Sequence, residues 1–399
     1  MTHHNSTFQA IKEGTEIKTK EGTFTVESVF SQGGSSIVYK VKYDEKSIFL
    51  LKEIIPSTID FERDPKDGIS IKCSKEIHKK HIERIAKHEA TMTGHLRNTY
   101  KEDQGDMPSA EVFWGAPLEI LEETDAKYLI YATTQGKTFE KYLNDSKKND
   151  ASKDAIIALL ERFKAIISVF NTALWEKDFV HLDIKSSNIY LSGKEESIRI
   201  LDLANAHCLD STINEDIIND HILGITPNYS APELCYLKQI QEEYLHYKAL
   251  SESNITILKD MGIGQMKKQR ALFYNQLENL SIKTDMYSLG MILENTFFKY
   301  DKKFLKRMIR FPSIRIIEKR LTQIIETATN ENPENRYADA KEFISDLDKC
   351  IDILNNRGFY EEVLFKNSFE KLSEKLEHLR KSEKVIDDNL LADIEIMGG

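Results

Sequence analysis

Cysteine is scarce in this sequence, and long apolar runs are missing. The 399 residues include four cysteines, which lie far apart and form neither a CxxC pair nor a cluster with histidine. This spacing excludes a disulfide framework and a zinc site, and it fits a reducing cytosol. The first 13 residues are polar, and no run reaches the roughly 18 apolar residues of a membrane span. The sequence therefore predicts a cytoplasmic protein without a membrane span, acting in its own cell or in one into which it is delivered.

A surplus of basic residues is also missing. Lys and Arg number 55 against 65 Asp and Glu, for a formal net charge of -10. This balance argues against nucleic acid as a partner, because such binding needs a basic footprint for the phosphates. Apolar residues at 40% and charged residues at 30% indicate an ordinary folded protein. The length suits one two-lobed enzyme or a domain with added segments.

The chain changes character along its length. Residues 15–53 contain three β-rich runs separated by turn formers, which predicts an antiparallel meander; the runs are 23–26, 37–41 and 48–52. Residues 56–80 are charged and predict a loop, followed by a helix over about 76–96 and a strand over 128–132. Beyond Gly136 the pattern is mainly helical, and the apolar stretch 155–174 predicts an amphipathic or buried helix.

The polar residues of one short segment suit phosphoryl transfer. Such a site needs a carboxylate to orient the attacking hydroxyl, a positive group near the phosphate, and oxygen ligands for magnesium. Within residues 181–189, Asp183, Lys185 and Asn188 offer all three. A second carboxylate, Asp202, directly follows the strand-like run 197–201, where the strand would fix its position.

These residues carry a resemblance to eukaryotic-type protein kinases. HLDIKSSN at 181–188 resembles the catalytic loop of that family, and Asp202-Leu203-Ala204 takes the place of the metal-binding DFG motif. Three further segments resemble family motifs in the family's order: 225–233 the end of the activation loop, 285–290 the helix under the catalytic loop, and 332–336 the DPxxR motif. The resemblance covers about residues 15–350.

The resemblance implies an α+β, bilobal protein-kinase-like fold. A small antiparallel-sheet N-lobe with an αC helix (about 15–133) would join a larger, mainly helical C-lobe (about 134–350). A tail (1–14) would precede the domain and a helical extension (351–399) would follow it, with insertions at about 56–80 and 234–283. The activity implied is that of an ATP-dependent serine/threonine kinase acting on protein substrates, with Mg²⁺ as cofactor and Mn²⁺ as an alternative.

The resemblance also implies roles for single residues. Asp183 would be the catalytic base, Lys185 would neutralise the γ-phosphate, and Asn188 and Asp202 would bind the metal. Thr226 would hydrogen-bond toward Asp183 and Lys185, and Glu233 and Arg336 would form a buried ion pair. Lys52 would contact the α/β-phosphates with Glu89 as its acidic partner and Glu83 as the alternative. The remaining nucleotide-site residues expected are Gly33, Gly34, Ser35, Ser36, Val38, Tyr131, Ala132 and Thr133.

The sequence departs from the family at three places. Ser31 and Ser36 replace the outer glycines of the glycine-rich loop, which predicts weakened nucleotide binding; a plain turn between strands explains this stretch as well. Leu182 replaces the arginine that receives an activation-loop phosphate, so modification of Ser211 or Thr212 is not expected to be required. Leu203-Ala204 replaces Phe-Gly.

Several alternatives remain at this stage. The fold could serve as a pseudokinase, a nucleotide-binding scaffold or interaction module, although Lys52, Asp183, Asn188 and Asp202 are all present. A small-molecule kinase would share the catalytic loop but lack the segment at 226–233. The 234–283 insertion reads as a surface elaboration or as a site for substrate or partner selection. The apolar stripe Phe365, Phe369, Leu372, Leu376 and Leu379 predicts a helix that packs on its own domain or mediates self-association or partner binding.

Overall fold

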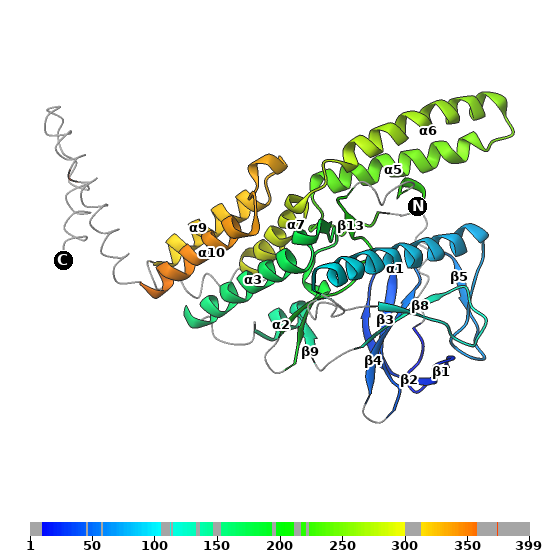
Figure 1. The fold of residues 1–399 in the computed structure, drawn as a ribbon, viewed down its shortest axis with the longest axis horizontal. Coiled ribbons are helices and arrows are strands. Elements are labelled where there is room, and N and C mark those ends of the chain that lie inside the picture. Colours follow the sequence, from blue (N-terminus) through cyan, green and yellow to red (C-terminus); the bar gives the residue numbers. More distant parts are fainter. Residues whose placement is uncertain are drawn as a thin grey trace, which may run out of the picture.

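A β-rich lobe and a larger helical lobe lie side by side in the computed structural model of the protein (Figure 1). The structure describes residues 10–44, 47–56, 59–104, 112, 115–132, 136–146, 153–193, 197–210, 217–220, 223–299, 313–356 and 373.

The smaller lobe is built on an antiparallel sheet of six strands in the order β1-β2-β3-β4-β8-β7. The strands are β1 (Glu16–Lys18), β2 (Thr23–Gln32), β3 (Ser36–Lys42), β4 (Ile48–Ile54), β7 (Gly115–Leu118) and β8 (Lys127–Ala132). On β3 the side chains of Ile37, Tyr39 and Val41 are completely buried, whereas the alternate Val38 and Lys40 are only partly covered. This period of two is what a strand with one face on the core requires, and the predicted meander is confirmed.

Residues 56–80 do not form the predicted loop. They contain a hairpin of β5 (Phe61–Arg63) and β6 (Ile71–Cys73), and the following helix begins at Glu76. One charged side chain of this segment is buried: the Arg63 guanidinium lies 2.9 Å from the Glu53 carboxylate of β4. The hydroxyls of Tyr39 and Tyr128 donate to the same carboxylate at 2.7 and 2.8 Å. This network attaches the hairpin to the sheet.

Helix α1 (Glu76–Gln104) belongs to both lobes. Near its start Ile82 and Ile85 pack in the core of the β-rich lobe, and farther along Met92 and Leu96 pack in the core of the helical lobe. The helix is longer than the predicted 76–96. Because Glu89 lies between these two groups, α1 holds its side chain at the junction of the lobes.

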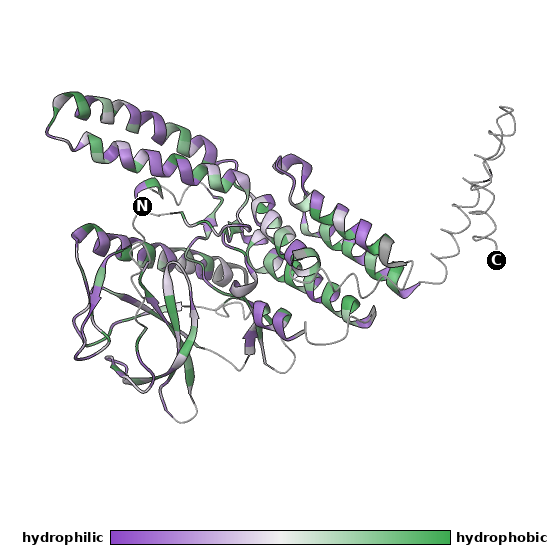
Figure 2. Ribbon diagram, turned by 180° about the vertical axis from the view of Figure 1, so that it is seen from behind, coloured by the Kyte–Doolittle hydropathy of each residue, from purple (hydrophilic) through white to green (hydrophobic). Residues whose placement is uncertain are grey.

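The larger lobe is mainly helical. Its long helices are α2 (Phe139–Ser146), α3 (Lys153–Ala173), α5 (Pro232–Ser251), α6 (Thr256–Leu277), α7 (Ile282–Glu294), α9 (Ser313–Ala328) and α10 (Ala340–Asn355). The central helix α3 buries Phe163, Ile166, Ile167 and Phe170, a spacing of three and four residues that places them on one face. Figure 2 shows hydrophobic and hydrophilic residues alternating along the helices of this lobe.

Short elements of the larger lobe hold the loops between the lobes. β9 (Gly136–Thr138), β11 (Ile189–Ser192) and β12 (Ser197–Ile200) form a small sheet in the order β12-β11-β9, and β10 (Phe179–Val180) pairs with β13 (His207–Cys208). Helical turns occur at Trp175–Lys177, Ser186–Asn188, Asn295–Lys299 and Pro333–Asn335, and α4 spans Ile217–Asp220. The predicted bilobal, protein-kinase-like α+β architecture is confirmed.

The two remaining predicted segments differ in outcome. The segment 234–283, predicted as an insertion, contains most of α5 and all of α6, which are joined by a short turn and project from the body as a two-helix arm (Figure 1). Helix α10 continues to Asn355, past the expected boundary at residue 350. The apolar stripe at 365–379 lies outside the described residues. In the part of the chain that is described, no helix combines the length and apolarity needed to cross a bilayer.

Candidate active site

The buried carboxylate of Asp285 holds the loop at 181–188 in place. Ser281 caps α7 and forms a reciprocal capping box with Thr284, which fixes the first turn of that helix. There the completely buried Asp285 accepts hydrogen bonds from the backbone N–H groups of His181 and Leu182 at 2.8 and 2.9 Å. Its carboxylate therefore ties the loop to the core of the helical lobe.

His181 links this loop to the strand that ends before Asp202. The ring is completely buried; one nitrogen, Nε2, lies 2.9 Å from the carbonyl oxygen of Leu201, and Nδ1 accepts from the backbone N–H of Asp183. Both ring nitrogens are thus engaged with backbone. The histidine therefore fixes the loop at 181–188 relative to Leu201, the residue after β12.

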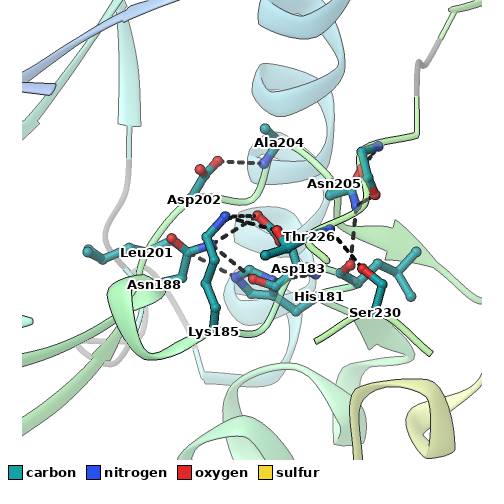
Figure 3. A network of polar contacts seen from close by, with 12 residues as sticks. His181, Asp183, Lys185, Asn188, Leu201, Asp202, Ala204, Asn205, Thr226 and Ser230 are labelled. Atoms are coloured by element: carbon teal, nitrogen blue, oxygen red, sulfur yellow. Dashed lines mark hydrogen bonds and ion pairs between the residues drawn. The ribbon is translucent and has the colours of Figure 1, made fainter. Parts of the chain in front are cut away.

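Three of the expected residues contact the Asp183 carboxylate (Figure 3). Lys185 Nζ lies 2.7 Å from Oδ2, and the Asn188 amide nitrogen donates to the same oxygen at 3.2 Å. Thr226 donates its hydroxyl proton to Oδ1 at 2.6 Å and lies 3.3 Å from Lys185 Nζ. Asp183 therefore has a fixed orientation, with a cation beside it.

Lys52 forms two ion pairs. Its Nζ lies 2.8 Å from Glu89 on α1 and 2.7 Å from Asp202, and its side chain is almost fully buried. The structure pairs Lys52 with Glu89, whereas Glu83 on the same helix is exposed. Burial disfavours the charged form of Lys52, but the carboxylates of Asp202 and Glu89 outweigh it and raise the pKa of the ammonium group.

Asp202 is held ionised in an unusual backbone conformation. Burial alone would raise its pKa, but the Lys52 and Lys185 ammonium groups outweigh that effect and hold the pKa well below its usual range. Its φ is 62°, in the left-handed region that non-glycine residues rarely adopt. Such conformations persist where surrounding contacts enforce them, and the ion pair with Lys52 is such a contact.

Tyr131 has a contact that the sequence did not reveal. Its ring lines the cleft between the lobes, as expected, but its hydroxyl donates to Glu89 Oε1 at 2.5 Å. Gly115, opposite it on β7, leaves room for the ring: a Cβ there would lie 2.6 Å from a ring carbon. Ala132 is exposed at the end of β8 and is not among the described residues that line the cleft, and Thr133 lies outside the described residues.

The cleft has a volume of about 470 Å³ and lies beneath the turn between β2 and β3. The expected nucleotide-site residues that line it are Gly33, Gly34, Ser35, Ser36, Val38, Lys52 and Tyr131; Glu89 does not. The expected Lys185, Asn188 and Asp202 also line it. The lining residues that were not expected are Phe30, Ser31, Gln32, Leu50, Glu140, Ser187 and Leu201. Val38 and Leu50 give it apolar lining, and the charged Lys52 and Asp202 lie next to each other in it. Asp183 does not line it, but its carboxylate contacts Lys185 and Asn188, which do.

The oxygen atoms of Asn188 and Asp202 fit a magnesium site. The Asn188 amide nitrogen donates to the Asp183 carbonyl at 2.9 Å, which leaves the amide oxygen as the atom that could bind a metal. Lys52 and the N–H of Ala204 both contact Oδ1 of Asp202, and Oδ2 accepts no hydrogen bond from the described residues. One carboxylate and one amide match the few protein ligands that Mg²⁺ takes beside nucleotide phosphates. Across the described chain, no group of three or more His, Cys, Asp or Glu side chains could hold a metal.

Glu233 and Arg336 form an ion pair distant from the cleft. The guanidinium donates to the two carboxylate oxygens at 2.7 and 2.9 Å, and the Arg336 side chain is completely buried. A further bond to the carbonyl of Lys283 connects it to the first turn of α7. The pair therefore joins the start of α5 to two other parts of the helical lobe.

Lys52, Glu89, Asp202 and the Asp183 loop thus lie together between the two lobes of a protein-kinase-like fold. No protein-family model matches the sequence, and no curated protein does. Among solved structures, the chain is similar to the PknI kinase domain of Mycobacterium tuberculosis, with 12% identity over 86% of this chain and 100% of that one, at a TM-score of 0.46. A double mutant of the same domain gives 12% identity, 86% and 99% coverage, and a TM-score of 0.45.

Proposed function

We propose that this protein is a serine/threonine protein kinase that transfers the γ-phosphate of ATP, with Mg²⁺, to hydroxyl groups of other proteins. The observation that carries the proposal is the linked set of contacts from Glu89 through Lys52 to Asp202, beside the Asp183–Lys185–Thr226 cluster. This set combines a phosphate-binding cation, metal-ligand oxygens and an oriented carboxylate in one cleft. Phosphoryl transfer depends on such positioning and on electrostatic stabilisation.

The residues divide the chemistry among themselves. Lys52 binds the α- and β-phosphates, and Asn188 and Asp202 bind the metal, which neutralises charge on the phosphates. Asp183 orients the substrate hydroxyl, whose oxygen bonds to the γ-phosphorus as the bond from that phosphorus to the leaving oxygen of ADP breaks. The hydroxyl proton passes to the Asp183 carboxylate, and Lys185 stabilises the negative charge on the transferred group.

Two features favour serine or threonine as the acceptor and independence from loop phosphorylation. Lys185 lies two residues after the base and contacts Thr226, the arrangement that resembles serine/threonine kinases. Leu182, in place of the phosphate-receiving arginine, is buried and has a φ of 60°. No cation is therefore present at position 182 to receive a phosphate.

Transfer of radiolabel from ATP to the protein itself and to dephosphorylated casein tests the proposal, with mass-spectrometric mapping of the modified residues. We expect labelling on serine and threonine by the wild type, and loss of labelling in Asp183→Asn and Lys52→Met. Phosphatase pretreatment should leave the rate unchanged. Magnesium-dependent nucleotide binding without any transfer would instead support the nucleotide-binding scaffold, which the substituted glycine-rich loop also favours.

A further inference from the structure

One hydrophobic cluster joins the catalytic loop, the segment before Thr226, and the α5–α6 arm. Leu182 of the catalytic loop lies in it, completely covered, together with Leu223 of the segment that leads to Thr226. The other buried members are Val180, Ile218, Leu234, Leu237, Ile240, Tyr244, Phe273, Leu277 and Leu280. The leucine that replaces the family's arginine is thus part of a core that the inserted helices help to build.

Helix α5 also binds the backbone of this segment through Gln241. The side chain is completely buried; its Oε1 accepts from the N–H of Leu223 at 3.0 Å, and its Nε2 donates to the carbonyl of Ile218 at 3.3 Å. One amide therefore satisfies a donor and an acceptor from two positions five residues apart. Because buried backbone groups are costly to leave unpaired, this contact fixes the path of the segment.

Two more side chains from the same face of α5 extend the contact. Tyr244 donates its hydroxyl to Asn219 at 3.0 Å, and Lys248 donates to the same oxygen at 2.7 Å. Residues 241, 244 and 248 follow the spacing of one helix face.

Helix α6 braces α5 from the other side. Gln269 donates to Glu243 at 2.7 Å, and Phe273 is completely buried in the shared cluster. Gly262 lets the two helices approach closely, because a Cβ there would lie 2.5 Å from the backbone nitrogen of Ser251.

The contact continues from Leu223 to the catalytic residues. The next residue, Gly224, exchanges two hydrogen bonds of 2.8 Å with the side chain of Asn205, which also donates to the carbonyl of Leu182 at 3.2 Å. Two residues farther on, Thr226 donates to Asp183. Leu223 is therefore connected to Asp183 by two routes, through Asn205 to the neighbouring Leu182 and along the chain to Thr226.

We propose that Gln241 is a positioning residue for phosphoryl transfer, and that the α5–α6 arm holds the segment before Thr226 in place without a phosphate. This proposal rests on the kinase activity proposed above. In the family that the sequence resembles, a phosphate on the activation loop binds an arginine and orders that loop. Here the arm would take over this ordering role. Gln241 acts through the backbone of Leu223 and is not among the described residues that line the cleft.

The test compares Gln241→Leu with Gln239→Leu, the same substitution on the exposed side of the same helix. Amide hydrogen exchange of the peptide containing Leu223 and Gly224 measures the contact directly and needs no catalysis. We expect exchange about ten-fold faster in Gln241→Leu, because the N–H of Leu223 and the carbonyl of Ile218 lose their partner. For casein phosphorylation, kcat/KM should fall about ten-fold while KM for ATP stays constant. Gln239→Leu should match the wild type in all three measurements.

A second variant covers the case in which Gln241→Leu does not fold. Tyr244→Phe keeps the ring in the cluster and removes only the hydroxyl, so we expect the same changes at about three-fold. Unchanged exchange and kinetics in the folded variants would overturn the proposal, as would an equal loss in Gln239→Leu. Absence of Asp183-dependent transfer in the wild type would refute the proposed activity and with it the catalytic role of Gln241, whereas the exchange measurement would still decide whether the arm fixes the segment.

Discussion

Replacing Arg63 with methionine tests whether the 56–80 hairpin is an integral part of the β-rich lobe. Methionine fills much of the same space but removes the only cation that contacts Glu53 among the described residues. The Arg63 and Glu53 side chains are 4% and 0% exposed, and one guanidinium nitrogen lies 3.0 and 2.9 Å from the two carboxylate oxygens. The hydroxyls of Tyr39 and Tyr128 remain, but they carry no charge. Glu53 would therefore become a buried, unpaired anion.

Breaking a buried ion pair on one side costs about 3–5 kcal/mol, because the remaining charge stays desolvated. We expect Arg63→Met to lower the free energy of unfolding by this amount, measured by urea denaturation followed by circular dichroism. The matched control is Lys20→Met, which breaks the 2.7 Å pair between Lys20 and Glu119. Those side chains are 70% and 77% exposed, so solvent screens the pair and the free energy of unfolding should stay close to that of the wild type.

The double variant Arg63→Met with Glu53→Gln separates charge from packing. It removes both charges and keeps hydrogen-bonding groups for the two tyrosines, so it should regain part of the stability lost in Arg63→Met. If Arg63→Met costs no more than Lys20→Met, the reasoning from burial fails. If the double variant is less stable than Arg63→Met, packing and not the unpaired charge accounts for the loss.

Three further perturbations test other parts of the structure. Glu89→Gln should lower the rate of phosphoryl transfer about 100-fold by releasing Lys52, whereas the exposed Glu83→Gln should leave the rate unchanged; equal rates in steady-state assays would contradict the pairing. Leu182→Arg should cost about 3 kcal/mol or more in thermal unfolding, because the new charge enters an apolar cluster, while Leu182→Met should cost less than about 1.5 kcal/mol. Burial lowers the pKa of His88 and of His207 to about 4, so the unfolded chain takes up these protons first. The free energy of unfolding should therefore be highest above about pH 6.5 and fall toward pH 4 by roughly 3 kcal/mol for each histidine. In urea titrations at several pH values, His88→Gln should show a smaller fall of the free energy of unfolding between about pH 6.5 and pH 4 than the wild type.

The residues nearest the proposed chemistry could be picked out from the sequence because they occupy short segments. Asp183, Lys185 and Asn188 lie within six consecutive residues, and the structure keeps them in contact through local hydrogen bonds. The β-rich runs were visible for a similar reason, since a half-buried strand repeats every two residues. The prediction of a loop at 56–80 was wrong. A run of charged residues usually indicates exposure to solvent, but the charged side chain of Arg63 is buried because it has a buried partner. That partner, Glu53, sits on another strand.

Local sequence pattern by itself determined three things: the segment 181–189 with the residues proposed to act in catalysis, the order of the accompanying motifs, and the amphipathic strands and helices. The sequence favoured Glu89 over Glu83 as the acid beside Lys52, and the tertiary structure shows that pairing. Only the tertiary structure decided that the Tyr131 hydroxyl contacts Glu89 and that Gln241 holds the backbone of Leu223. Each of these depends on two side chains or backbone groups from separate elements meeting in a buried place. No periodicity along the chain encodes such a meeting, because it depends on how the elements pack.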